Sequence, residues 1–382
     1  MLLIRVKHLS SIYLFNPGTV GFWGSISIAV NTLTGPGMLQ LPATFQRSGF
    51  IPTSACIVFV SCLCSMCALN FANVISKVPG NKNFTHEVEY SGVFQLFWGR
   101  NWFIITQTAY TACILCQLIA SIVDVSQVVD TYMGSTFTQA SSLQYSPPSS
   151  NRTLVYVNWD LDSACGDVID SPTTTCVAFN RPTDSHLILT GGYILCFAVF
   201  VPLSLMDLKE NIVWQIVGFI MLLIFSCQFA LAFFSDYTRQ LPDEHTNLTL
   251  WGHQWECLFG IVLFNFTVVT AVPAWLYEKH DKISVPQSTS ATHSIKVILS
   301  IFILIIFFDF FIEVIHFSNA GSAFLYIIVG GLGALSMPRV NDNMLSSMIA
   351  GAEGPGLQIG ASLFAFFIIG LGIPLFRYAL NT

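Results

Sequence analysis

Charged side chains are scarce in this sequence. Only 9% of its residues are Asp, Glu, Lys or Arg, against 53% hydrophobic ones, and the stretch from Leu9 to Gln46 contains none. A chain with so little charge cannot keep most of its surface in contact with water, which excludes an ordinary soluble domain. The mean hydropathy of +0.66 points the same way. The sequence therefore predicts an integral, multi-pass membrane protein.

Residue groupings that would indicate an enzyme or a metal site are also missing. No Ser-His-Asp set or His-X-Glu cluster is evident. The Cys-X-X-Cys pairs Cys64–Cys67 and Cys113–Cys116 lie inside apolar runs, where cysteine usually packs as a small apolar residue. We expect no enzymatic activity, no metal, no cofactor and no nucleic-acid partner.

Long apolar runs follow one another along the chain. A helix of about 20 apolar residues crosses the hydrocarbon core of a bilayer, which is about 30 Å thick. The candidate spans are 9–46, 48–76, 101–123, 187–206, 211–234, 257–277, 297–317, 320–338 and 354–376. They predict an all-α polytopic membrane protein. Only Ser318 and Asn319 separate 297–317 from 320–338, so either both segments cross or one of them is re-entrant or an insertion.

Lys and Arg set the orientation, because the side of the membrane with more of them in short loops is usually cytoplasmic. With the N-terminus inside, the inner side receives Arg5, Lys7, Lys77, Lys82, Arg100, Lys209, Lys279, Lys282 and Lys296, and the outer side receives Arg47, Arg152, Arg181 and Arg239. The predicted organisation is a cytoplasmic N-terminus at 1–19, spans 1–3 at 20–130, an extracytoplasmic loop at 131–186, spans 4 to 8 or 9 at 187–376 and a short C-terminus at 377–382.

The loops assigned outside carry modification signals. Asn151 and Asn247 each begin an Asn-X-Thr sequon, which is used on the lumenal face, and both lie in outer loops. Cys165 and Cys176 share the longest outer loop, where they form either a disulfide or two free thiols. The sequence does not distinguish the plasma membrane from a vacuolar or lysosomal membrane, and it leaves the oligomeric state open.

The first span contains the helix-breaking sequence Thr34-Gly35-Pro36-Gly37. Glycine tolerates most backbone angles, and proline cannot donate an intrahelical hydrogen bond. Irregular backbone at membrane depth survives where it lines a cavity or is buried in protein. The freed amides and carbonyls of a break there would suit a zwitterion. A simple kink is the alternative, since Gly and Pro are frequent in membrane helices.

The surrounding block, "NTLTGPGMLQLPATFQRSGFIP", resembles the first-helix signature of the amino acid/auxin permease family. The likeness continues through "ANVISKVPGN" and "ASIVDVSQVVD" and returns at "GIPLFRYALN". The resemblance implies two inverted five-helix repeats with broken first and sixth helices, and secondary transport of amino acids. The second broken helix would lie in "CLFGIVLFNFTVVTAVPAWLYEKHD". The implied substrate-binding residues are Asn31, Thr34, Gly35, Pro36, Gly37, Met38, Leu39, Asn265, Phe266 and Thr267.

Two departures from the family pattern shape the expectations. In sodium-coupled members, the residue at Asn31 helps to hold the ion with a hydroxyl from the eighth span. This chain has Gly370 and Gly372 in that region, so a proton gradient is the expected driving force. The family also has about eleven spans, whereas this sequence ends at Thr382, so we expect the second repeat to be incomplete.

Acidic residues inside apolar spans are candidate proton carriers, because a charge is costly at that depth. Asp309 and Asp124 are the two candidates. Asp309, Glu313 and His316 share one helical stripe. However, Glu313 and His316 are expected near the outer end of the span, where lipid headgroups would explain them, and Asp124 suits either a gate or the interface.

Two classes of function remain open at this point. The first is a proton-coupled amino acid symporter whose unwound first helix holds the substrate. The second is a non-transporting amino acid sensor, or a truncated transporter, on the same scaffold. In both, the partners are a small-molecule amino acid and the lipid bilayer.

Overall fold

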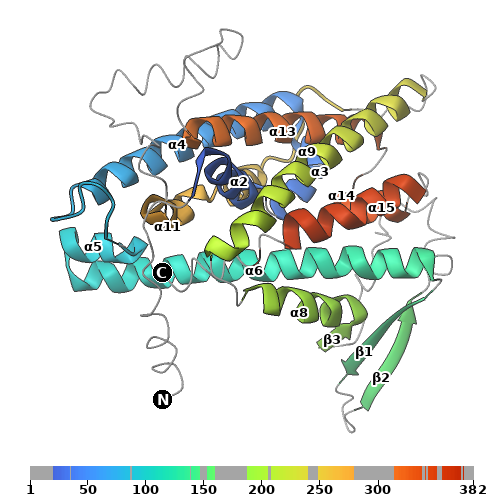
Figure 1. Cartoon of the computed structure of the whole chain (residues 1–382). Coiled ribbons are helices and arrows are strands. Elements are labelled where there is room, and N and C mark those ends of the chain that lie inside the picture. Colours follow the sequence, from blue (N-terminus) through green and yellow to red (C-terminus); the bar gives the residue numbers. More distant parts are fainter. Residues whose placement is uncertain are drawn as a thin grey trace.

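Helices make up most of the computed structural model (Figure 1). It describes residues 20–34, 36–86, 88–137, 139–146, 153–159, 187–204, 208–239, 248–278, 314–337, 340, 343–350, 355–370 and 373. The α-helices are α2 (Phe22–Leu33), α3 (Leu41–Ser48), α4 (Phe50–Ser76), α5 (Tyr90–Trp98), α6 (Arg100–Thr136), α8 (Gly191–Ser204), α9 (Leu208–Arg239), α10 (Leu258–Asn265), α11 (Val272–Glu278), α13 (Val314–Ser336), α14 (Met344–Ala350) and α15 (Pro355–Phe364). The described residues also form two 3-10 turns, η2 (Pro36–Gln40) and η3 (Val268–Ala271), and one π-helical turn, η5 (Ala365–Gly370).

Five of the described segments are long and apolar enough to cross a bilayer: Phe50–Ser76, Arg100–Thr136, Ile212–Thr238, Leu258–Glu278 and Val314–Ser336. Gly191–Pro202 and Gly356–Gly370 are shorter apolar helices. The chain is therefore an all-α polytopic membrane protein, as its composition predicts. In Figure 1, α6 runs along one side of the bundle, the contacting helices α4 and α13 lie on the opposite side, and α2 and α11 lie between them.

A small antiparallel sheet is the part of the fold that the sequence did not predict. Strands β1 (Ala140–Ser146), β2 (Thr153–Trp159) and β3 (Leu187–Thr190) pair in the order β2-β1-β3. The predicted span 187–206 therefore begins as a strand and becomes helical only at Gly191. In addition, α6 continues to Thr136, beyond the predicted end of the third span at residue 123.

One helix replaces the connection expected at Ser318 and Asn319. Both residues are buried inside α13, so the separation into two spans at this point is wrong. His316 lies two residues after the start of α13. The far end of α13 meets α3, since Gln46 Nε2 donates to Met337 O at 2.7 Å. His316 is only 5% exposed and lies deep against α4, with its Nδ1 atom 2.6 Å from Ser65 Oγ.

The segments α2–η2–α3 and α10–η3–α11 run antiparallel and are joined at both ends. At one end, Val20 N donates to Glu278 O at 3.0 Å. At the other end, Gly252 N donates to Ser48 O at 2.9 Å. A side chain at Gly252 would overlap Arg47 O, so glycine permits this close backbone approach. The pairing sets the two interruptions opposite each other within the bundle.

Candidate functional site

The first interruption lies between α2 and α3. Thr34 leaves the helix with ψ 64°, although its N–H still donates to Val30 O at 2.8 Å. Pro36 begins the turn η2, and Pro42 occupies the first turn of α3, where its missing N–H costs no hydrogen bond. The helix break predicted from Thr34-Gly35-Pro36-Gly37 is confirmed, with Gly35 itself outside the described residues.

The second interruption lies between α10 and α11 and contains no glycine. Phe266 leaves the helix with ψ 59°, and Thr267 caps the turn η3. Thr267 O accepts hydrogen bonds from Thr270 N at 3.0 Å and Thr270 Oγ1 at 2.7 Å. Pro273 then begins α11 with Val272. This interruption, too, falls where the sequence predicts it.

The two interruptions are in direct contact. A Cβ atom placed on Gly37 would lie 2.6 Å from Asn265 Nδ2, so the Asn265 amide rests on the Gly37 backbone. Asn265 is 1% exposed, and its Nδ2 atom donates to Ile261 O at 2.9 Å. Its Oδ1 atom has no hydrogen-bond partner among the described residues. One buried acceptor therefore remains available where the breaks meet.

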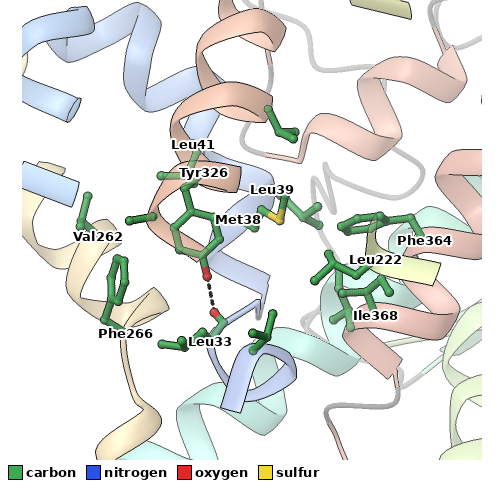
Figure 2. Packing of buried hydrophobic residues seen from close by; sticks show 14 of the residues in the cluster. Leu33, Met38, Leu39, Leu41, Leu222, Val262, Phe266, Tyr326, Phe364 and Ile368 are labelled. Atoms are coloured by element: carbon green, nitrogen blue, oxygen red, sulfur yellow. Dashed lines mark hydrogen bonds between the residues drawn. The ribbon is translucent and has the colours of Figure 1, made fainter. Parts of the chain in front are cut away.

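Side chains from other helices cap one carbonyl of each break. The Tyr326 hydroxyl of α13 donates to Leu33 O, the last residue of α2 (Figure 2). The Cys64 thiol of α4 donates to Phe266 O at 3.0 Å. The rings of Phe266 and Tyr326 meet edge to face, with their centroids 5.5 Å apart. These contacts connect the two breaks to the helices behind them.

A third helix reaches the second break through Gln117 of α6. Gln117 Nε2 donates to Thr267 Oγ1 at 2.7 Å. Gln117 is 1% exposed, and its Oε1 atom has no partner in the described part of the chain. The amide is therefore fixed through its nitrogen and has a free oxygen beside Thr267. Its presence at the site was not predicted from the sequence.

Asn31 lies in the last turn of α2, as predicted, but faces α9. Its Nδ2 atom donates to both the backbone O and Oε1 of Gln215, each at 2.8 Å. Its Oδ1 atom is buried without a partner among the described residues. Asn31 thus ties the first broken helix to α9 and retains one free acceptor.

The remaining predicted site residues divide into two groups. Thr34 is buried, and its hydroxyl donates back to Val30 O at 2.9 Å. Met38 and Leu39 are core residues that lie between Tyr326 on one side and Leu222 and Phe364 on the other (Figure 2). The second group, Gly35, Asp309, Glu313, Asn151, Asn247, Cys165 and Cys176, lies outside the described residues.

Asp124 is described and is partly buried on α6. It follows Gln117 by two helical turns, so the two side chains share one face of the helix about 10 Å apart along its axis. Among the described residues, no group of three or more His, Cys, Asp or Glu side chains could hold a metal ion.

Gln117, Gln215 and Tyr326 are the site residues that sequence reasoning missed. The available signal was weak: each is a single polar or amphipathic residue in an otherwise apolar run. Such residues usually face protein rather than lipid, because an unpaired polar group in hydrocarbon is costly. Which of the two breaks each residue contacts depends on how the helices pack, and this packing cannot be deduced from a single sequence.

Comparison with known proteins finds a match to the tryptophan/tyrosine permease family over residues 19–157. The matched region includes the first break, α4 and α6, but ends before the second break. No curated protein matches this chain. The family match points to an amino acid transporter family rather than an enzyme. It does not show the more specific assignment to the amino acid/auxin permeases.

Proposed function

We propose that this protein is a secondary active transporter of amino acids, which binds its substrate where the two interrupted helices meet. The observation that carries the proposal is the contact of Gly37 with Asn265, which brings both breaks to one point in the bundle. Paired broken helices at the midplane of an antiparallel arrangement are the usual binding site of such transporters. The family match supports the substrate class, and the family's name favours tryptophan and tyrosine.

The free groups around the breaks suit the two charges of an amino acid. Amides at the start of a half-helix favour a carboxylate. The free Oδ1 atom of Asn265, at the contact of the two breaks, is an acceptor for an ammonium group. Because a buried acceptor without a partner costs about 1–3 kcal/mol, a bound ammonium would relieve a cost that the empty site carries.

Proton coupling is part of the proposal. Gly370 packs so tightly against the ring of Phe200 that a larger side chain there would overlap the ring. The hydroxyl expected of a sodium-coupled relative therefore has no room at this position. Asp124 is the described candidate for the proton carrier, because it lies on the helix face that carries Gln117 to the second break.

Uptake into proteoliposomes containing the purified full-length chain tests the transport proposal. We expect labelled tryptophan and tyrosine to accumulate when the outside is acidic, with or without sodium. Gly37→Ala should reduce uptake strongly, because the new Cβ would overlap the Asn265 amide at the proposed substrate position. Gly260→Ala is the matched control, since a Cβ there meets nothing within 4 Å. Saturable binding without uptake by the wild type would contradict transport and favour a sensor.

Asp124→Asn tests the proton carrier. We expect this variant to lose accumulation driven by the pH gradient but to keep exchange of labelled for unlabelled substrate, because exchange needs no net proton movement. Asp236→Asn, near the end of α9, is the matched control and should behave as the wild type. Normal pH-driven accumulation by Asp124→Asn would remove Asp124 from the mechanism, and accumulation driven only by sodium would overturn proton coupling.

A further inference from the structure

Gln117 has an acceptor that nothing in the described part of the protein uses. We propose that Gln117 determines the substrate specificity of the site, with its Oε1 atom accepting a hydrogen bond from the side-chain N–H or O–H of an aromatic amino acid. This inference rests on the proposed function and deepens it, since it names the residue that would recognise the substrate side chain.

The local geometry fixes which part of Gln117 is free. Its Nε2 atom is committed to Thr267 Oγ1 at 2.7 Å, and the Thr267 backbone is itself held by Thr270. The amide therefore cannot turn without losing a buried hydrogen bond. Its Oε1 atom is buried with no partner among the described residues. Native proteins rarely leave such an atom unpaired, so this one calls for an explanation.

The surroundings of Gln117 suit an aromatic ring. Tyr110, Ile114 and Gln117 follow one another at helical spacing on one face of α6. Tyr110 and Ile114 form a small apolar cluster of their own, and both are buried. The Tyr110 hydroxyl lies 3.5 Å from Thr270 O, at the same turn η3. An apolar stripe that ends in one free acceptor matches an apolar ring that carries one donor.

The chemistry of a lone acceptor defines the preferred substrates. The indole of tryptophan has one N–H donor and no acceptor, and the phenol of tyrosine has an O–H donor. Phenylalanine has the same apolar surface but would leave the acceptor unpaired. A site built to bond a substrate donor rejects the analogue that lacks it by up to about 10⁴-fold. Acidic side chains would be repelled, because Oε1 and a carboxylate are both acceptors.

The α-amino and α-carboxyl groups have other partners in this scheme. The free Asn265 Oδ1 atom and the first break lie at the contact between the two broken helices. Gln117 comes from a helix outside that pair and touches the second break two residues beyond Asn265. This separation assigns the constant part of the substrate to the breaks and its variable part to α6.

Competitive uptake of tryptophan, tyrosine and phenylalanine in proteoliposomes tests the assignment. We expect wild type to favour tryptophan and tyrosine over phenylalanine by at least about tenfold. Gln117→Met, which keeps the length and removes the acceptor, should bring that ratio close to one by raising KM for tryptophan and tyrosine. Gln117→Glu, which keeps acceptor oxygens, should retain the preference. Gln95→Met, on the exposed surface of α5, should match the wild type.

The outcomes separate the inference from the proposed function. If wild type takes up none of the panel, the proposed function fails. If wild type transports tryptophan and tyrosine and Gln117→Met leaves the ratio unchanged, the role of Gln117 is overturned while transport stands. A variant that folds poorly lowers uptake of all three substrates in proportion, so the ratio between substrates remains informative. Thr267→Val is a second, independent variant for the same measurement. Freeing the Gln117 amide from Thr267 should reduce the ratio without abolishing it.

Discussion

The two interrupted helices of this protein reach the same point with different residues. The first break consists of small and rigid residues around Pro36 and Gly37, and a buried tyrosine caps its carbonyl. The second break has no glycine and consists of Asn265, Phe266 and Thr267. The first therefore exposes backbone at close range, whereas the second supplies side-chain amide and hydroxyl groups. In the proposed binding site, this difference would assign the charged groups of the substrate to the first break and its side chain to the second.

Substitutions at the contact between Gly37 and Asn265 test this difference between the two breaks most directly. Gly37→Ala should lower the stability of the protein by about 1–3 kcal/mol, because the new Cβ overlaps the Asn265 amide. The double variant Gly37→Ala/Asn265→Ala removes the atoms that clash. It should be within about 1 kcal/mol of Asn265→Ala alone, as measured by thermal unfolding in detergent.

Transport should behave differently from stability in that series. The double variant regains folding but not uptake, because the Asn265 Oδ1 atom is no longer present to accept from the substrate. Strictly additive losses of stability would show that Gly37 does not need space beside Asn265. Recovery of uptake in the double variant would show that Asn265 acts only as a neighbour and not as a ligand.

The sequence predicts the first break more completely than the second. A Gly-Pro-Gly motif disturbs a helix through its own covalent chemistry, so Thr34 to Gly37 identify that break locally. At the second break, the sequence offers polar residues and Pro273, which indicate an interruption but not its partners. Gln117 and Tyr326 are recruited from helices far away in the chain, and only the packing of the bundle brings them there.

The same reasoning explains the errors in the topology. Ser318 and Asn319 looked like a connection because two polar residues interrupt an apolar run. In the structure both are buried inside α13, and Ser61 Oγ of α4 donates to Asn319 O at 3.2 Å. Small and polar residues inside a membrane helix also mediate contacts between helices, and hydropathy alone does not separate that role from a loop. The strand at 187–190 was missed because a short apolar strand and the start of a helix have similar composition.

The two carbonyl caps provide a smaller test of the difference between the breaks. Tyr326→Phe removes the hydroxyl that donates to Leu33 O and should cost about 1 kcal/mol of stability. Cys64→Ala removes a weaker thiol donor to Phe266 O and should cost less, since the side chains around Thr267 also hold the second break. Tyr193→Phe on α8 is the control for loss of a hydroxyl. Thermal unfolding measures all three, and a larger loss for Cys64→Ala than for Tyr326→Phe would mean that the second break, not the first, depends on its cap.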